Sequence, residues 1–360
     1  MTVYDLARPE IRDLKPYSMP DIPEDFTRMN ENEATNSPYG QTAAGHANRY
    51  PEIRPFAIQS ALAGLFDVDA SSLCPTRGSS EGIDLLIRTF CRAYTDNVVV
   101  LPPTFEMYAA YARMQAAEVR VANLCSDSDF AVDWSLVDSQ CDANTKIIFL
   151  CSPNNPTGNL ISQEEILSFA EQRRDRSIVV VDEAYIEFCD RSSIAVKIEQ
   201  LENLVVLRTL SKAYALAGAR CGAVIGSNQL IQIISAMMSP FAFSAPVHEL
   251  VLLALQPANV EAANRQITAT VRERRRMESL LQELDVTERV WRSDANFIYV
   301  QFCNLAAVHE AVTERQIVIR EFGNNRDNSD APDCARITVG SVTENNRLLD
   351  ALNSAGGATK

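Results

Sequence analysis

Short apolar runs alternate with amphipathic stretches through the middle of the chain. Three runs rich in β-branched residues lie at 97–101, 146–150 and 178–181, and two shorter ones lie at 204–207 and 223–225. Strands that are apolar on both faces are typical of a parallel sheet covered by helices on both sides. The pattern therefore predicts an α/β fold with a mostly parallel sheet.

Helical periodicity appears between these runs. Apolar residues recur at helical spacing over 83–90, directly after Ser79 and Ser80, which we expect to cap that helix. Ser162 followed three residues later by Glu165 matches a capping box and predicts the start of another helix.

The pattern changes after about residue 260. A charged helical stretch at 272–283 precedes strand-like runs at 296–302, 317–322 and 336–339, and a helical pattern follows at 345–352. This order predicts a second, smaller α+β domain.

The length fits two domains, since a domain commonly has about 150 residues. We expect residues 1–40, which are polar and interrupted by prolines, to form an N-terminal arm. The large domain is expected at 41–258 and the small C-terminal domain at 259–360.

Composition narrows the possible partners and compartments. A formal net charge of −14 disfavours nucleic acid as a partner. The cysteines are scattered without a CxxC pair, which indicates reduced thiols and a cytoplasmic protein. His46, His248 and His309 lie too far apart in sequence to suggest a metal site.

No membrane segment or signal peptide is expected. The N-terminus is charged throughout. The stretch 221–247 has no charged residue, but polar residues and prolines interrupt it, so it predicts a buried element or a subunit interface.

The strongest local signal for chemistry is a lysine after a predicted strand. Ser211 and Lys212 follow the run at 204–207, and small, uncharged residues predominate from there to Arg220. Such surroundings can desolvate a lysine, which lowers its pKa and makes it available as an imine-forming amine. Arg220 adds a guanidinium suited to an anion. The alternative for Lys212 is an ordinary solvated side chain at a strand end.

Three further junctions carry polar or small residues. Asp182 ends the run at 178–181, and ligand-binding groups gather at such strand ends in α/β folds. The run at 146–150 leads into a rigid turn at 151–158. Small residues at 76–80 precede a helix, whose N-terminus can bind an anion. Each junction alone has a structural alternative, but together they predict one binding site.

These junctions resemble those of the fold-type-I pyridoxal-phosphate (PLP) aminotransferases. The motifs are Thr-Arg-Gly-Ser-Ser at 76–80, Ser-Pro-Asn-Asn-Pro-Thr-Gly at 152–158, Asp-Glu-Ala-Tyr at 182–185, and Ser-Lys at 211–212 with Arg220. A narrower resemblance to the histidinol-phosphate aminotransferases comes from Asn48–Pro51, Leu101–Phe105, Ser293–Phe297 and Arg336–Gly340. The resemblance extends over about 11–352. It implies an aspartate-aminotransferase-like large domain and a smaller C-terminal domain.

The resemblance implies PLP as the cofactor and assigns residues to it. Lys212 would bind PLP covalently and move the reacting proton, and Asp182 would pair with the ring nitrogen. Tyr185 and Asn155 would donate to the phenolate oxygen, and Phe105 would stack on the ring. The phosphate would lie among Gly78, Ser79, Ser80, Ser211 and Arg220, together with Tyr50 of a neighbouring subunit in a homodimer.

The resemblance also implies a reaction, the transfer of an amino group from histidinol phosphate to 2-oxoglutarate in histidine biosynthesis. Arg336 matches the arginine for the α-carboxylate, Arg320 the arginine for the substrate phosphate, and Tyr17 an aromatic residue that covers the substrate. Two departures border the substrate: 30–40 carries extra residues and 324–330 is unusually polar.

Other activities remain open at this point. The nearest is an aromatic amino acid aminotransferase acting on Phe or Tyr, and a PLP-dependent threonine-phosphate decarboxylase is a second. A non-catalytic regulator is disfavoured because Lys212 is present. An NAD dehydrogenase is disfavoured because glycines 218, 222 and 226 do not form a GxGxxG motif.

Overall fold

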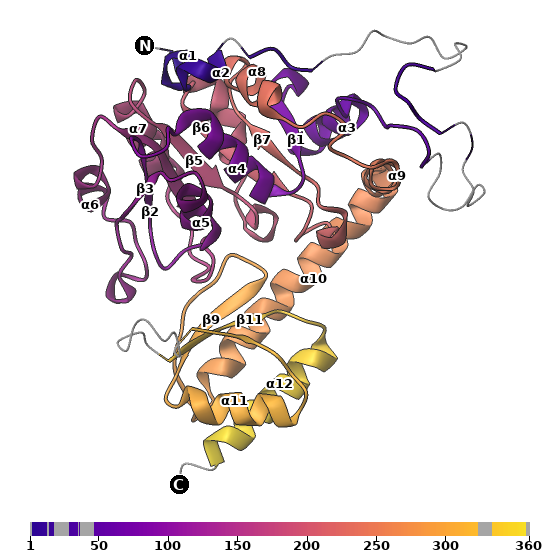
Figure 1. Ribbon diagram of the computed structural model, residues 1–360. Coiled ribbons are helices and arrows are strands. Elements are labelled where there is room, and N and C mark those ends of the chain that lie inside the picture. Colours follow the sequence, from indigo (N-terminus) through magenta and orange to yellow (C-terminus); the bar gives the residue numbers. More distant parts are fainter. Residues whose placement is uncertain are drawn as a thin grey trace.

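The computed structural model describes residues 2–12, 14–17, 29–34, 36, 47–322 and 333–357 of the chain (Figure 1). Of the two departures noted in the sequence, 324–330 lies wholly outside this part and 30–40 lies partly outside it.

A seven-stranded sheet organises the larger unit, in the order β1-β7-β6-β5-β4-β2-β3. The pairs β2–β3, β2–β4, β4–β5 and β5–β6 are parallel, whereas β7 is antiparallel to β1 and β6. The mostly parallel sheet expected from the apolar runs is thus confirmed. Its strands are β1 Leu73–Thr76, β2 Asn97–Val100, β3 Glu118–Val121, β4 Thr145–Cys151, β5 Ile178–Asp182, β6 Leu204–Thr209 and β7 Gly222–Ile225.

Helices cover the sheet with their apolar faces. They are α3 Phe56–Phe66, α4 Ser79–Phe90, α5 Met107–Met114, α6 Trp134–Ser139, α7 Gln163–Gln172, α8 Asn228–Met237 and α9 Ala245–Ala254. Ser162 caps α7 as predicted, and its hydroxyl accepts the backbone N–H of Glu165 at 3.4 Å. The predicted cap of α4 is wrong. Gly78 occupies the cap position with φ +76°, a backbone conformation that glycine adopts without strain, so Ser79 and Ser80 begin the helix itself.

The smaller unit contains an antiparallel sheet in the order β10-β11-β9-β8. Its elements are α10 Pro257–Gln282, β8 Thr287–Val290, β9 Phe297–Phe302, α11 Leu305–Glu314, β10 Arg320–Glu321, β11 Cys334–Thr338 and α12 Val342–Gly357. The strand expected at 317–322 is shorter, because only Arg320 and Glu321 pair with β11 and Val318 is 95% exposed. The charged helix begins at Pro257, well before 272, because proline fits the first helical turn.

Helix α10 runs from the larger unit into the smaller one (Figure 1). A buried apolar cluster that includes Tyr185, Phe188, Ile267 and Phe297 joins the two units. Within this junction the buried guanidinium of Arg274 donates to the backbone oxygens of Phe188 at 3.2 Å and Ala295 at 2.7 Å. The second sheet is thereby held close to the carboxyl end of β5.

The first residues differ from the expected arm. Helices α1 Val3–Leu6 and α2 Pro9–Arg12 contact α8. Val3, Leu6 and Ile11 are buried in the main core because their apolar side chains face the sheet unit. Among the described residues, no helix is both long and apolar enough to cross a membrane.

Candidate active site

Three neighbouring strands deliver side chains to one cavity. The parallel strands β4, β5 and β6 end at the same edge of the sheet, at Cys151, Asp182 and Thr209. A cavity of about 240 Å³ lies there, lined by Ser79, Ser80, Phe105, Cys151, Asn155, Asp182, Ala184, Tyr185, Thr209, Ser211, Lys212, Ala217, Arg220 and Arg336. The fold therefore gathers most of the site residues predicted from the sequence, although their motifs are far apart along the chain.

Lys212 projects its amine into this cavity. The Nζ atom lies 5.6 Å from the centroid of the Tyr185 ring. Partial burial lowers the pKa of Lys212, and the positive charges of Arg336 and Arg220 lower it further, against the opposing effect of Asp182. A larger fraction of the amine is therefore unprotonated near neutral pH than for a solvated lysine, as a nucleophile or base requires.

Asp182 provides a buried carboxylate in the same cavity. It is 3% exposed and accepts hydrogen bonds from the Tyr108 hydroxyl at 2.8 Å and the Ala184 N–H at 3.1 Å. Burial raises its pKa to about 6, while these two donors favour the ionised form. Such a carboxylate is suited to pair with a cationic group of a ligand.

Tyr108 is a residue that the sequence analysis missed. It is fully buried and stacks on Phe149 with ring centroids 4.8 Å apart. The sequence did contain one signal for Tyr108, its position three residues after Phe105. This spacing places two side chains on the same face of a helical turn. The two rings are in contact, with centroids 5.6 Å apart. Its hydroxyl fixes the position of the Asp182 carboxylate by donating a hydrogen bond to it.

The start of α4 forms a cradle for an anion. A Cβ atom at Gly222 would lie 2.6 Å from the Arg208 carbonyl oxygen and 3.0 Å from the Ser79 nitrogen. A Cβ at Gly78 would lie 2.7 Å from Arg220 Nη2. These glycines keep the backbone N–H groups of the first helical turn close to the guanidinium, which is the chemistry that binds phosphate.

Polar groups from the end of β6 and from the segment between β6 and β7 complete this cradle. Arg220 Nη1 donates to the Ser211 hydroxyl at 3.3 Å and to the Ala217 carbonyl at 2.9 Å. The Thr209 hydroxyl donates to that of Ser211 at 3.0 Å. Thr209 was also missed, although its place two residues before Ser211 at the end of β6 was visible in the sequence.

Arg336 brings a cation from the second sheet. It lies on β11, donates from Nη1 to the Asn155 amide oxygen, and has its Cζ atom 5.4 Å from the Phe297 ring centroid. Burial lowers the pKa of Arg336, but an arginine stays charged at neutral pH. Its other N–H groups are suited to a carboxylate or phosphate.

Four predicted residues lie outside the cavity lining of this chain. One is Gly78 at the cap of α4, and the others are Arg320, Tyr50 and Tyr17. Arg320 is the register partner of Arg336 across β10 and β11, so it lies at the rim. Tyr50 stacks on Phe241 at 4.5 Å and is 47% exposed. Tyr17 is 52% exposed. The structure does not bring Tyr17 or Tyr50 to the lysine of the same chain.

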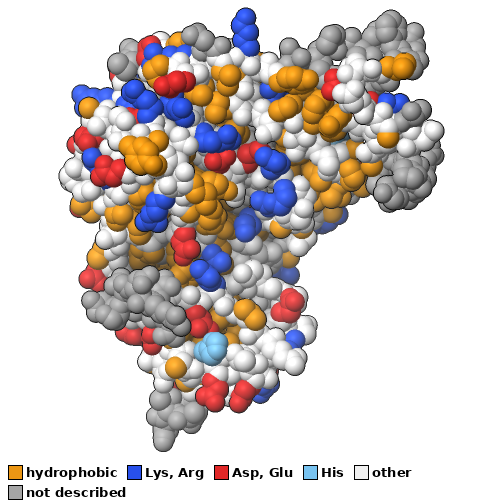
Figure 2. Space-filling model, viewed as in Figure 1, with side chains coloured by type: hydrophobic (Ala, Val, Ile, Leu, Met, Phe, Trp, Pro, Cys, Tyr) orange, Lys and Arg blue, Asp and Glu red, His pale blue; other side chains and the backbone are white. Residues whose placement is uncertain are grey.

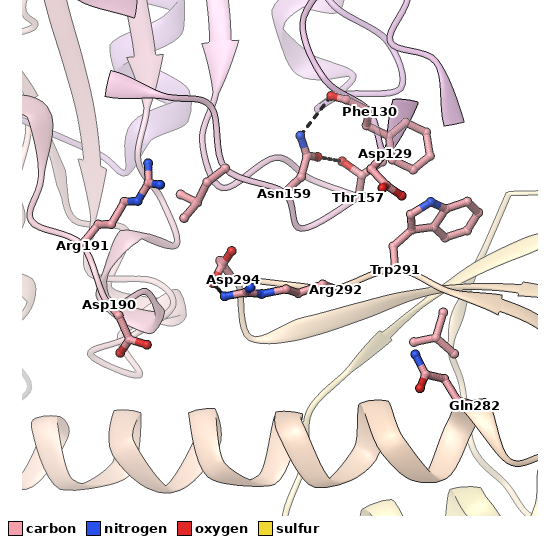
Figure 3. A pocket seen from close by; sticks show the side chains of 12 residues that line it. Asp129, Phe130, Thr157, Asn159, Asp190, Arg191, Gln282, Trp291, Arg292 and Asp294 are labelled. Atoms are coloured by element: carbon pink, nitrogen blue, oxygen red, sulfur yellow. Dashed lines mark hydrogen bonds and ion pairs between the residues drawn. The ribbon is translucent and has the colours of Figure 1, made fainter. Parts of the chain in front are cut away.

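A larger cavity lies between the two units. Its volume is about 580 Å³, and residues such as Trp291, Arg292 and Asp294 line it (Figure 3). Thr157 and Asn159 also line this larger cavity. Asn155, from the same turn, lines the smaller cavity. None of the described residues that line the larger cavity is a lysine, so chemistry and not size selects the smaller one as the candidate active site.

The surrounding surface is locally basic. Lys and Arg side chains gather along the middle of the face in Figure 2, where the larger unit meets the smaller one, although the whole chain is acidic. Within the described residues, no cluster of three or more His, Cys, Asp or Glu side chains could hold a metal ion.

Comparison with known proteins identifies the family of the chain. The family model of aminotransferase class I and II matches residues 23–352. The histidinol-phosphate aminotransferase of Serratia proteamaculans is 35% identical over 100% of this chain and 98% of its own length.

Solved structures show the same fold. That of histidinol-phosphate aminotransferase from Sinorhizobium meliloti in complex with pyridoxal-5'-phosphate has a TM-score of 0.78 at 21% identity, covering 88% of this chain and 86% of that chain. L-threonine-O-3-phosphate decarboxylase from Porphyromonas gingivalis has a TM-score of 0.71 at 24% identity, covering 87% and 92%. At such identities the likeness establishes the fold alone.

Proposed function

The chain belongs to the class I and II aminotransferase family, and from this premise we propose that it transfers the amino group of histidinol phosphate to 2-oxoglutarate, with PLP as its cofactor. The similarity to curated histidinol-phosphate aminotransferases extends over the whole chain. The structural observation that supports this choice of donor is the position of Arg320. It is the register partner of Arg336 on the neighbouring strand, so two arginines lie side by side near the cavity.

The residues of the cavity fit PLP. The cradle kept open by Gly78 and Gly222 suits a phosphate, with Ser79, Ser80, Ser211 and Arg220 as its ligands. Asp182 would face the ring nitrogen, Phe105 would pack on the ring, and Asn155 and Tyr185 would donate to the ring hydroxyl. When bound, PLP supplies a carbonyl carbon that takes up the amine and a ring that withdraws electrons from it.

Lys212 performs the proton transfer in this proposal. Its amine removes the proton from the amine-bearing carbon of the donor and later acts as the corresponding acid. The lowered pKa of Lys212 favours the first role. Asp182, held by Tyr108, keeps a positive charge opposite its carboxylate and so stabilises the electron density released at the donor carbon.

Arg320 and Arg336 explain why the proposed amino donor carries a phosphate. Histidinol phosphate carries a phosphate ester where an amino acid carries its α-carboxylate. A phosphate dianion extends further from the amine-bearing carbon than an α-carboxylate and has twice its charge. It therefore needs a second cation beside Arg336, and Arg320 occupies that position. An aromatic amino acid would use Arg336 alone.

Arg320→Ala tests this assignment. We expect kcat/KM for histidinol phosphate to fall about 10- to 150-fold, since a hydrogen bond to a charged group contributes about 1.5–3 kcal/mol. The rate with glutamate as donor should change much less, because its α-carboxylate is bound by Arg336. Steady-state kinetics with both donors measure the difference, and equal losses for the two would show that Arg320 does not bind the phosphate.

We also propose that the enzyme is a homodimer with shared active sites. Phe56 on α3 and Leu253 on α9 are 63% and 54% exposed, and the two helices are in contact, so they form an apolar face. Tyr50 extends from the same region and would reach the cofactor phosphate of the partner. Sedimentation at decreasing concentration should show PLP lost as the dimer dissociates. Tight PLP binding by a stable monomer would contradict shared sites.

We place the enzyme in the cytoplasm. All nine cysteines are free thiols, as expected in a reducing compartment. Cell fractionation with an antibody against the chain checks this, and recovery in an oxidising compartment would contradict it.

A further inference from the structure

An ion pair connects the two units at the mouth of the active site. Arg320 Nη2, on β10, lies 3.5 Å from Glu106 Oε1, which directly follows Phe105 of the cavity lining. Both side chains are more than half exposed, at 58% for Arg320 and 71% for Glu106. The contact therefore lies where a substrate enters and not in the core.

Among the described residues, Glu106 is the acidic side chain that forms an ion pair with Arg320. The neighbouring acid on β10, Glu321, instead contacts His309 at 2.9 Å. Glu106 forms no other ion pair among the described residues, and its side chain does not cap α5. Of the described acids, Asp182 alone lines the cavity, and it is buried behind the ring-binding part of the site. Glu106 is thus the acidic side chain next to the two arginines.

The charges of these three residues match the two substrates of a transaminase. Arg336, Arg320 and Glu106 together carry a formal charge of +1, which balances the α-carboxylate of glutamate, one of its two carboxylates. Without Glu106 the two arginines carry +2, which balances a phosphate dianion. One pocket must accept both anions in alternate half-reactions, so the partner of Arg320 has to change between them.

We infer that Glu106 is a specificity-determining residue that neutralises Arg320 when a carboxylate substrate is bound and releases it when a phosphate-bearing donor binds. This inference rests on the proposed function. With the substrate glutamate, Arg336 binds the α-carboxylate and Arg320 stays paired with Glu106. With histidinol phosphate, the dianion displaces the singly charged side chain of Glu106 from Arg320, since the phosphate has more charge and more acceptor oxygens.

Glu106→Gln in the holoenzyme tests the inference. Removing the competing charge should lower KM for histidinol phosphate about two- to fivefold, the range expected for an exposed ion pair, and leave kcat unchanged. The inhibition constant of inorganic phosphate should fall by a similar factor, whereas KM for glutamate should change less than about twofold. Raising the salt concentration should shrink the difference, because the pair is exposed.

Two further variants separate this role from a general effect. Glu261→Gln is the matched control, since it removes one charge and one exposed ion pair, with Arg265, on α10. It should leave every constant unchanged. In an Arg320→Ala background, Glu106→Gln should have no effect on KM for histidinol phosphate. An unchanged or higher KM in the single variant, or the same decrease in the Arg320→Ala background, would overturn the inference.

The outcomes also separate this inference from the proposed function. If the wild-type enzyme did not turn over histidinol phosphate, the proposed function would fall. The inhibition of the glutamate reaction by inorganic phosphate would still decide the role of Glu106, because that measurement needs no phosphorylated donor.

Discussion

Lys212→Ala should reduce kcat by at least about 10²–10⁴-fold, the contribution typical of a positioned acid or base. The expected loss is larger than that, because in the proposed function the same amine would also hold the cofactor covalently. Two observations favour both roles. Lys212 lines the same cavity as Asp182, and its pKa is lowered by burial and by Arg336 and Arg220.

The covalent role has its own measurement. Reduction of the wild-type holoenzyme with borohydride should attach the cofactor to the peptide that contains Lys212, and Lys212→Ala should show no attachment and no visible absorption band of the covalent form. Lys197→Ala is the matched control, because this lysine lies on another segment and does not line the cavity. Retention of the band and of turnover in Lys212→Ala would refute the assignment.

Asp182→Asn should produce the second-largest loss, about 10²–10⁴-fold in kcat. The amide has nearly the same shape but no charge, so it cannot keep a proton on a ring nitrogen opposite it. Because Asp182 is 3% exposed, no water replaces the lost interaction. We expect weaker cofactor binding in the same variant.

Tyr108→Phe provides a graded comparison for this prediction. It removes the 2.8 Å hydrogen bond to Asp182 but leaves the carboxylate and the ring stack on Phe149. Its loss in kcat should be smaller than that of Asp182→Asn, corresponding to about 1.5–3 kcal/mol for one hydrogen bond to a charged group. Wild-type kcat and cofactor affinity in Asp182→Asn would contradict the role of the carboxylate.

The sheet could be predicted because its strands are buried on both faces. Runs such as Val98–Val100 and Val179–Val181 are apolar at every position, which marks a central parallel strand without knowledge of its neighbours. The short β10 could not be predicted in this way. Its pattern extends over 317–322, but pairing with β11 limits the strand to Arg320 and Glu321.

The site could be predicted where its residues follow one another along the chain. Asp182 ends β5 and Lys212 follows β6, so sequence order alone places them at the same sheet edge. Tyr108 approaches Asp182 only through the packing of α5 on the sheet. The contact of Glu106 with Arg320 depends on how the second unit is held against the first. Both contacts join distant segments, so no local pattern predicts either partner. The spacing of Tyr108 from Phe105 predicts only that these two rings lie together.

The central claim is that the enzyme moves an amino group from a phosphate-bearing donor. Glutamate formation by the holoenzyme from 2-oxoglutarate should be measured with histidinol phosphate, phenylalanine and threonine phosphate, together with release of CO₂. We predict that kcat/KM for histidinol phosphate exceeds that for phenylalanine about 10- to 150-fold, because phenylalanine has no phosphate to bind Arg320. Equal or better use of phenylalanine, or CO₂ release from threonine phosphate without glutamate formation, would contradict the account.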